Sequence, residues 1–328
     1  PMTTLTPFKI ALIQEPPVFL NLEASVVKAL NLIETAAGSG ARIIIFPETW
    51  LPGYPVWLDF SPAAGLWDHP PAIALYRVLS ENALEISGPA LEQLQQAAGN
   101  NDAWVVMGAH EKDGGTLYNT IVYLSPDGSV RIHRKLMPTY TERLIWGRGD
   151  GSTLTVLETA YGRLGGLICW EHWMPLARAA MHAKRETLHI AQWPMVKELH
   201  QIASRHYAFE GQCYVTAAGC VLSKKDVLEG FCSQYRTDHP AYELLAGMPG
   251  DDNELLLKGG STIIGPDAGY VTAPLYKKAA TIYGEIDPGR IAEGHLTLDT
   301  DGHYARPDVF ELRVNDAPQR AVRFRSQE

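Results

Sequence analysis

Residues 165–176 are GGLICWEHWMPL, a stretch that joins a short apolar run to a reactive side chain. Residues 164–168 are predicted to form a buried strand, because the run is short and apolar and a helical pattern follows at about 175–183. Cys169 comes directly after this strand. Ligands of α/β sheets gather beyond the carboxyl ends of strands, so Cys169 is predicted to lie where a ligand would bind.

Two other apolar runs end in the same way. Residues 43–46 (IIIF) lead to Glu48, and residues 130–133 lead to Lys135. A carboxylate, an ammonium and a thiol are therefore expected at one sheet edge. Because a free cysteine has a pKa of about 8.5, it needs activation. Glu48 could take the thiol proton as a general base, and Lys135 could stabilise negative charge on an attacked substrate.

A second carboxylate, Glu142, follows Lys135 and could orient it or the substrate. Each of these residues also has an ordinary structural interpretation. Cysteine is often buried as a small hydrophobe, a glutamate can cap a helix, and a lysine after a strand is usually solvated. Several histidines, including His172, could suggest a Cys–His pair, but no sequence feature selects one as a base.

The rest of the chain alternates apolar runs with helical patterns, which predicts an α/β fold with mixed sheets. Residues 54–71 and 223–258 lack periodicity and are predicted to be long loops at a pocket wall or a subunit interface. We find no linker, so residues 1–328 are predicted to form one domain with a short tail after about 290. Further strands are predicted at residues 8–13, 104–108, 117–124, 188–192, 214–218, 261–264 and 279–286, and helices at 26–37, 91–98 and 198–210.

Composition excludes several classes of protein. The 328 residues are 46% hydrophobic and 20% charged, so the chain can bury a core without a disulfide or a metal. A formal net charge of -9 and no basic stripe argue against nucleic-acid binding. No apolar run reaches the 18 or more residues of a membrane span, and the N-terminus lacks a secretory signal. Four cysteines in no metal-binding pattern indicate reduced thiols in a cytoplasmic protein.

Three motifs resemble the carbon-nitrogen hydrolase (nitrilase) superfamily. They are PETWLPGYP at 47–55, HRKLMPTYTERLIWGRGDG at 133–151 and GGLICWEHWMPL at 165–176. The order Glu, Lys, Glu, Cys matches that superfamily, and the resemblance extends to about Gly289. Within it, CWEHWMPLARAAMHAK followed by IAQWP at 190–194 is similar to bacterial nitrilases of the true nitrilase branch.

The resemblance implies a four-layer α-β-β-α sandwich with two mixed β-sheets. It also implies homo-oligomers, dimers and in some cases spirals. Covalent catalysis by the cysteine is expected to require no metal or organic cofactor. The catalytic roles that the resemblance implies are Glu48 as base, Lys135 as charge stabiliser, Cys169 as nucleophile and Glu142 as a fourth carboxylate, helped by the backbone N–H of Trp170. Its implied substrate-binding residues are Tyr54, Trp170, Trp193 and His172.

The expected reaction converts a nitrile to a carboxylic acid and ammonia through a thioimidate and a thioester on Cys169. Aromatic residues in the motifs favour arylacetonitriles or apolar aliphatic nitriles. Four alternatives stay open at this point. They are an amidase or carbamoylase, a nitrile or cyanide hydratase that stops at the amide, a non-enzymatic scaffold, and a papain-like Cys–His protease, which the strand-end pattern and the Lys135 motif disfavour.

Overall fold

The computed structural model describes residues 6–322, and its first sheet has six strands. The central strands β1, β2 and β3 are parallel, and antiparallel neighbours flank them, so the sheet is mixed. In spatial order the strands are β13 (Thr281–Ile286), β1 (Phe8–Ile13), β2 (Ala41–Ile45), β3 (Trp104–Asp113), β4 (Thr116–Leu124) and β5 (Val130–Arg134).

The second sheet has seven strands and is also mixed. Its parallel centre consists of β7, β8 and β9, and antiparallel pairs extend it on both sides. In spatial order the strands are β10 (Val221–Ser223), β11 (Leu255–Ile264), β9 (Tyr214–Ala218), β8 (Leu188–Gln192), β7 (Gly162–Ile168) and β6 (Val156–Thr159), with β12 (Tyr270–Tyr276) paired to β11.

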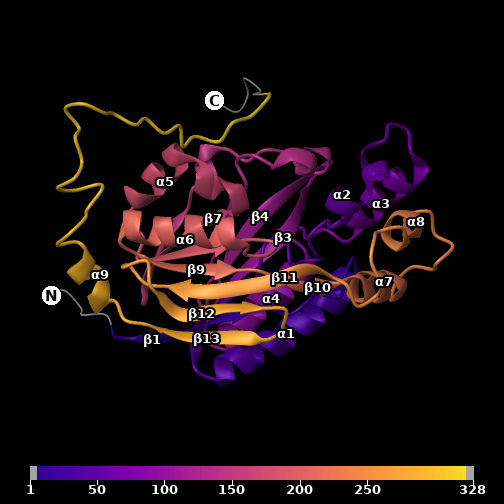
Figure 1. Cartoon of the computed structure of the whole chain (residues 1–328), viewed down its shortest axis with the longest axis horizontal. Helices are drawn as coiled ribbons and strands as arrows, with labels where there is room; N and C mark the ends of the chain where they lie inside the picture. Colours follow the sequence, from indigo (N-terminus) through magenta and orange to yellow (C-terminus); the bar gives the residue numbers. More distant parts are fainter. Residues whose placement is uncertain (1–5, 323–328) are drawn as a thin grey trace.

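Helices cover the outer face of each sheet. Helices α1 (Leu22–Gly38) and α4 (Pro89–Asn100) pack on the first sheet, and α5 (Pro175–His182) and α6 (Glu198–Gly211) lie on the second (Figure 1). Apolar side chains of β1 and β2 meet those of β7 and β8 between the sheets. The predicted four-layer α-β-β-α sandwich with two mixed sheets is therefore confirmed.

The two segments predicted to be loops contain short helices, so that prediction was wrong. Helices α2 (Trp57–Phe60), α3 (Pro70–Glu81), α7 (Lys224–Cys232) and α8 (Tyr242–Ala246) gather at one end of the molecule, with η1 (Pro62–Gly65) beside α2 (Figure 1). Local capping explains α7, because the Ser223 side chain accepts from Asp226 N and the Asp226 carboxylate accepts from Ser223 N. Helices α2, α7 and α8 are too short to show a clear 3.6-residue period, whereas α3 has 12 residues, lies mostly beyond residue 71 and was not predicted.

After α9 (Gly289–Gly294) the described chain has no further helix or strand through residue 322. This segment runs along the outside of the molecule and is mostly exposed (Figure 1, yellow). Within residues 6–322, no helix combines the length and the hydropathy that crossing a membrane requires. The single-domain interpretation stays a prediction, which is consistent with a core shared by both sheets.

Candidate active site

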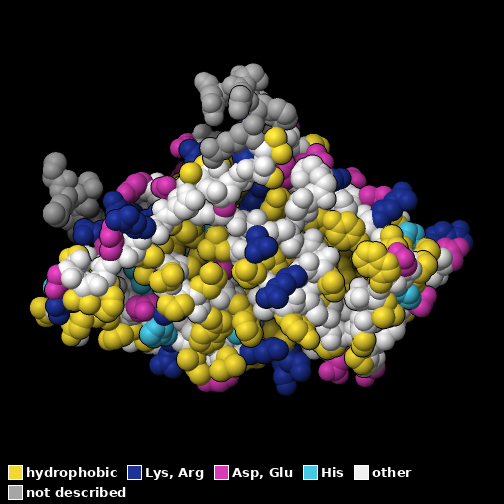
Figure 2. Space-filling view, turned by 90° about the horizontal axis from the view of Figure 1, so that it is seen from above, with side chains coloured by type: hydrophobic (Ala, Val, Ile, Leu, Met, Phe, Trp, Pro, Cys, Tyr) yellow, Lys and Arg dark blue, Asp and Glu magenta, His cyan; other side chains and the backbone are white. Residues whose placement is uncertain are grey.

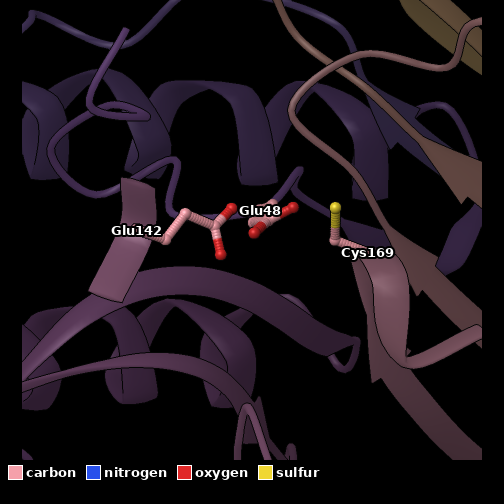
Figure 3. Close-up of side chains that lie close together, drawn as sticks. All are labelled: Glu48, Glu142 and Cys169. Atoms are coloured by element: carbon pink, nitrogen blue, oxygen red, sulfur yellow. The ribbon is translucent and has the colours of Figure 1, made fainter. Parts of the chain in front are cut away.

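Four of the predicted site residues come together at the strand ends. Glu48 follows β2, Lys135 follows β5 and Cys169 follows β7, while Glu142 belongs to the short 3-10 helix η2 (Tyr140–Leu144). Sγ of Cys169 and one carboxylate oxygen each of Glu48 and Glu142 lie within 4.8 Å of one another. Figure 3 shows the Glu48 carboxylate between the other two side chains.

The Lys135 ammonium lies between the two carboxylates. Its Nζ is 3.0 Å from Glu48 Oε1 and 2.7 Å from Glu142 Oε2, and its side chain is fully buried. Burial disfavours the charge, but the Glu48, Cys169 and Glu142 charges outweigh burial and raise the pKa of Lys135. The residue therefore stays an ammonium. It occupies the position between the two carboxylates and offsets one of their two charges.

Glu48 has the properties of a base that works near neutral pH. Burial raises its pKa to about 7, Lys135 opposes this rise, and the nearby Glu142 charge adds to it. Asn119 Nδ2 donates to Glu48 Oε1 at 2.6 Å. The other oxygen, Oε2, is buried and has no hydrogen-bond partner among residues 6–322, so it is free to accept a proton.

Cys169 is almost fully buried and has an unusual backbone conformation. It begins the 3-10 helix η4 (Cys169–Trp173) with a φ of 53°. Burial and the Glu48 charge raise the pKa of the thiol, and the backbone N–H of Trp170 acts in the opposite direction. The resting group is therefore a thiol, which must lose its proton to a neighbouring base before it can attack.

Besides Lys135, two further donors fix the Glu142 carboxylate. The Tyr54 hydroxyl donates to Oε1 at 2.9 Å, and the backbone N–H of Thr139 donates to Oε2 at 2.6 Å. Tyr54 was predicted from the sequence as a substrate-binding residue, and it does line the cavity beside Cys169. Its hydrogen bond gives it a second role, which is to orient Glu142.

A buried ion pair that sequence reasoning missed connects the strand ends that carry Lys135 and Cys169. Glu171 accepts the backbone N–H of Leu136 at 2.8 Å and that of Ile168 at 2.6 Å. These residues adjoin Lys135 and Cys169, so one carboxylate bridges both sheets. His133 Nε2 lies 2.9 Å from Glu171 Oε2, and Glu171 in turn raises the pKa of His133 against the effect of burial. The only sequence signal was the position of Glu171 in the motif around the cysteine.

A cavity of about 210 Å³ opens beside Cys169. Tyr54 and Trp170 line it, as the sequence predicted, but Trp193 and His172 do not. Both of these side chains are buried behind Cys169, with exposures of 0% and 1%, so substrate contact through this cavity would need them to move. Other lining residues are Asp59, Thr139, Tyr140, Thr141, Glu142, Pro194, Met195, Lys197, His200 and Leu257.

Together the fold and the site define a class of hydrolase with a buried thiol, a carboxylate base and a paired ammonium. The family model for carbon-nitrogen hydrolases matches residues 9–295. The chain belongs to the carbon-nitrogen hydrolase family, which confirms the resemblance found in its motifs.

Individual relatives cover nearly the whole chain. An aliphatic nitrilase of Sinorhizobium fredii is 38% identical over 97% of this chain and 99% of its own length. A bifunctional nitrilase/nitrile hydratase of Lupinus angustifolius is 36% identical over 96% of this chain and 88% of its own length. A solved structure from Xanthomonas campestris, described as a CN-hydrolase superfamily protein, is 17% identical, covers 90% of this chain and 96% of that chain, and has a TM-score of 0.65. At that identity it supports the fold alone.

Proposed function

We propose that this protein is a nitrilase that hydrolyses organic nitriles to carboxylic acids and ammonia. The observation that carries the proposal is the Cys169 thiol within 4.8 Å of two carboxylates that share the Lys135 ammonium. The relatives named as nitrilases support a nitrile as the substrate. The papain-like alternative requires a histidine against the thiol, whereas His172 hydrogen-bonds the Cys169 carbonyl oxygen.

The first half of the reaction forms a covalent intermediate. Glu48 takes the proton of the Cys169 thiol as sulfur attacks the nitrile carbon, and one C–N π bond breaks. The nitrile nitrogen receives that proton from Glu48, which leaves a neutral thioimidate. Negative charge develops on nitrogen during attack, so the Lys135 ammonium stabilises the transition state. The carboxylate of Glu48 is then ready for a second proton transfer.

The second half consumes two water molecules. Glu48 takes a proton from the first water, whose oxygen attacks the thioimidate carbon. The tetrahedral intermediate expels ammonia after its nitrogen is protonated, and a thioester remains. A second water, activated in the same way, releases the carboxylic acid and the free thiol. A pKa of about 7 lets Glu48 act as base and acid in turn near neutral pH.

We infer small arylacetonitriles or apolar aliphatic nitriles as substrates. The cavity of about 210 Å³ is smaller than the roughly 300–1,000 Å³ of sites for drug-sized ligands. Tyr54, Trp170 and Leu257 provide aromatic and apolar walls. A panel of phenylacetonitrile, benzonitrile and an aliphatic dinitrile tests this inference, and a preference for benzonitrile would contradict it.

The same residues could act on an amide, or could release an amide instead of an acid. The relative with both nitrilase and nitrile hydratase in its name makes the second route the stronger alternative. Formation of the acid and formation of the amide from a nitrile share the tetrahedral intermediate. Expulsion of ammonia leads to the acid, and expulsion of the cysteine sulfur gives the amide. Product analysis by chromatography with ammonia determination separates them, and turnover of the matching amide alone would identify an amidase.

Mass spectrometry of the protein trapped with nitrile tests the covalent step. We expect a thioimidate or thioester mass on the Cys169 peptide, and no such mass in Cys169→Ala. The matched control is Cys232→Ala, because Cys232 is the exposed thiol and lies far along the chain in α7. Wild-type turnover in Cys169→Ala would end the proposed mechanism.

We also propose self-association through the face that carries α5 and α6. Exposed apolar side chains on this face include Leu176, Leu199, Ile202 and Phe209. Figure 2 shows hydrophobic side chains spread over the face seen from above, with few acidic groups between them. Exposed apolar surface of this kind marks protein–protein contacts. Light scattering should show a dimer or larger species in the wild type and a smaller one in Leu199→Asp.

A further inference from the structure

A chain of buried side chains holds the backbone of the nucleophile from behind. The φ of Cys169, 53°, lies in a region that residues with a Cβ adopt only when their surroundings enforce it. The Cys169 carbonyl oxygen is 2.6 Å from Nδ1 of His172. Since a carbonyl oxygen only accepts, Nδ1 of His172 carries a proton and donates it.

The second nitrogen of His172 faces another histidine. His172 Nε2 lies 3.0 Å from His189 Nε2. Burial and the His189 charge lower the pKa of His172 well below its usual value, so its ring is neutral. A neutral imidazole with its proton on Nδ1 has an acceptor at Nε2. His189 must therefore donate from its Nε2.

The chain ends on a carboxylate. His189 Nδ1 is 2.8 Å from Glu186 Oε1, and the Tyr207 hydroxyl donates to Glu186 Oε2 at 2.5 Å. Burial favours protonated Glu186, but the His189 charge and these hydrogen bonds outweigh burial and lower the pKa of Glu186. An ionised Glu186 only accepts, so both nitrogens of His189 donate. The hydrogen bonds therefore run in one direction: His189 donates to His172, and His172 donates to the Cys169 carbonyl oxygen.

Ring packing keeps this alignment rigid. The Trp193 ring stacks on His172 with centroids 4.9 Å apart, and Tyr207 stacks on His189 at 3.7 Å. The four residues have exposures of 0–1%, so neither substrate nor bulk water reaches them. The His172 ring therefore cannot exchange its two nitrogens without repacking its neighbours.

We propose that His172 is a positioning residue for the nucleophile, with its proton held on Nδ1 by His189 and Glu186, so that it fixes the Cys169 backbone with the thiol against Glu48. The proposal rests on the proposed function of Cys169 as nucleophile. Because His172 touches no part of the cavity, its loss should lower kcat and leave KM nearly unchanged. It also gives Trp193, which does not line the cavity, a role in holding this ring.

Two substitutions separate the two hydrogen bonds of His172. In His172→Asn the side-chain nitrogen takes the place of Nδ1 and keeps the bond to the Cys169 carbonyl. In His172→Gln the amide reaches the place of Nε2, which keeps the contact with His189 and loses the bond to Cys169. Both are made in Cys232→Ala, so that alkylation by iodoacetamide reports on Cys169. The measurements are kcat, KM, the alkylation rate located by peptide mass spectrometry, and the melting temperature.

Misplacing a reacting group by about 1 Å can cost about 10²-fold in rate. We expect His172→Gln to lose between about 10-fold and 10²-fold in both kcat and alkylation rate, with KM within about threefold. His172→Asn should recover most of that loss. Equal rates for the two variants at equal melting temperatures would overturn the proposal.

A measurement on unsubstituted protein covers the case in which a variant fails to fold. Among the signals of the eleven histidines, nitrogen-15 NMR of histidine-labelled wild type should show the His172 ring neutral with its proton on Nδ1, and a His172 proton on Nε2 would overturn the proposal. Alkylation requires no nitrile, so it separates this proposal from the proposed function. If the variants differ in alkylation while wild type turns over no nitrile, only the proposed function fails.

Discussion

Replacement of Lys135 by methionine removes the one cation between two buried carboxylates. Loss of a charge-stabilising donor costs about 10²–10³ in rate. A second loss follows, because Lys135 lowers the pKa of Glu48, which is about 7 with the ammonium present. Each unit by which that pKa rises lowers the ionised fraction of the base about tenfold near pH 7. We therefore expect Lys135→Met to lose at least about 10³ in kcat for ammonia release.

The same substitution should destabilise the fold in a pH-dependent way. Breaking a buried ion pair costs about 3–5 kcal/mol when the remaining charge cannot be neutralised. A carboxyl whose folded pKa lies above its unfolded value favours folding at low pH, and this contribution is lost as pH rises. In the wild type the free energy of unfolding stops falling once the pH passes the Glu48 pKa. In the variant that pKa is higher, so the free energy of unfolding keeps falling above pH 7, by about 1.4 kcal/mol for each pH unit up to the new pKa.

Urea unfolding at about pH 6 and about pH 8.5, at one protein concentration, measures both effects. The matched control is Lys225→Met, because Lys225 is exposed and only 3.7 Å from Glu229 at the surface. Its unfolding free energy should change by no more than about 0.5 kcal/mol at either pH. Turnover of Lys135→Met within tenfold of wild type, or the same destabilisation at both pH values, would refute this reasoning.

Three further outcomes follow from the geometry. The value of kcat/KM should rise with pH through about 7 as Glu48 loses its proton, and a profile flat from pH 5 to 8 would show that Glu48 is not the base. Tyr54→Phe removes the 2.9 Å bond to Glu142 and should cost about 1.5–3 kcal/mol in transition-state stabilisation, measured as kcat/KM. Glu171→Gln puts an amide NH₂ in place of one accepting oxygen, so the buried N–H of Leu136 or Ile168 loses its acceptor; urea unfolding should show a loss of about 1–3 kcal/mol, and a loss under 1 kcal/mol would contradict a bridging role.

The strand ends that carry the site could be predicted because each short apolar run has a reactive residue beside its end. Strands β1, β8 and β9 have the predicted bounds, and residues 164–168 lie within β7. Strand β12 (Tyr270–Tyr276) was missed because it is half-exposed at the sheet edge and has no apolar run. The buried face predicted for α1 is nearly the observed one. It differs in that Leu30 is only half-buried and Ala29 lies in the core.

Contacts between distant elements account for most of what the sequence could not predict. Asn119 lies on β4, 71 residues from Glu48, and its local sequence gives no sign of that bond. His172 and Trp193 were placed at the substrate because they lie in the motifs, whereas the structure places both side chains in the core. Periodicity assigns a side chain to a face of its own element, but it does not show what the neighbouring element presents there.

Burial and the shared ammonium together set the pKa of Glu48 at about 7. Burial is the largest cause of the rise, and the Lys135 charge opposes it. Glu142 takes the closer contact with the same Nζ, at 2.7 Å against 3.0 Å, and its own charge raises the pKa of Glu48. Two carboxylates and one ammonium leave one negative charge uncompensated in a buried site. When the Cys169 proton moves to Glu48, the negative charge passes to sulfur and then to the nitrile nitrogen, where the Lys135 ammonium stabilises it, so the net charge of the site does not change during attack.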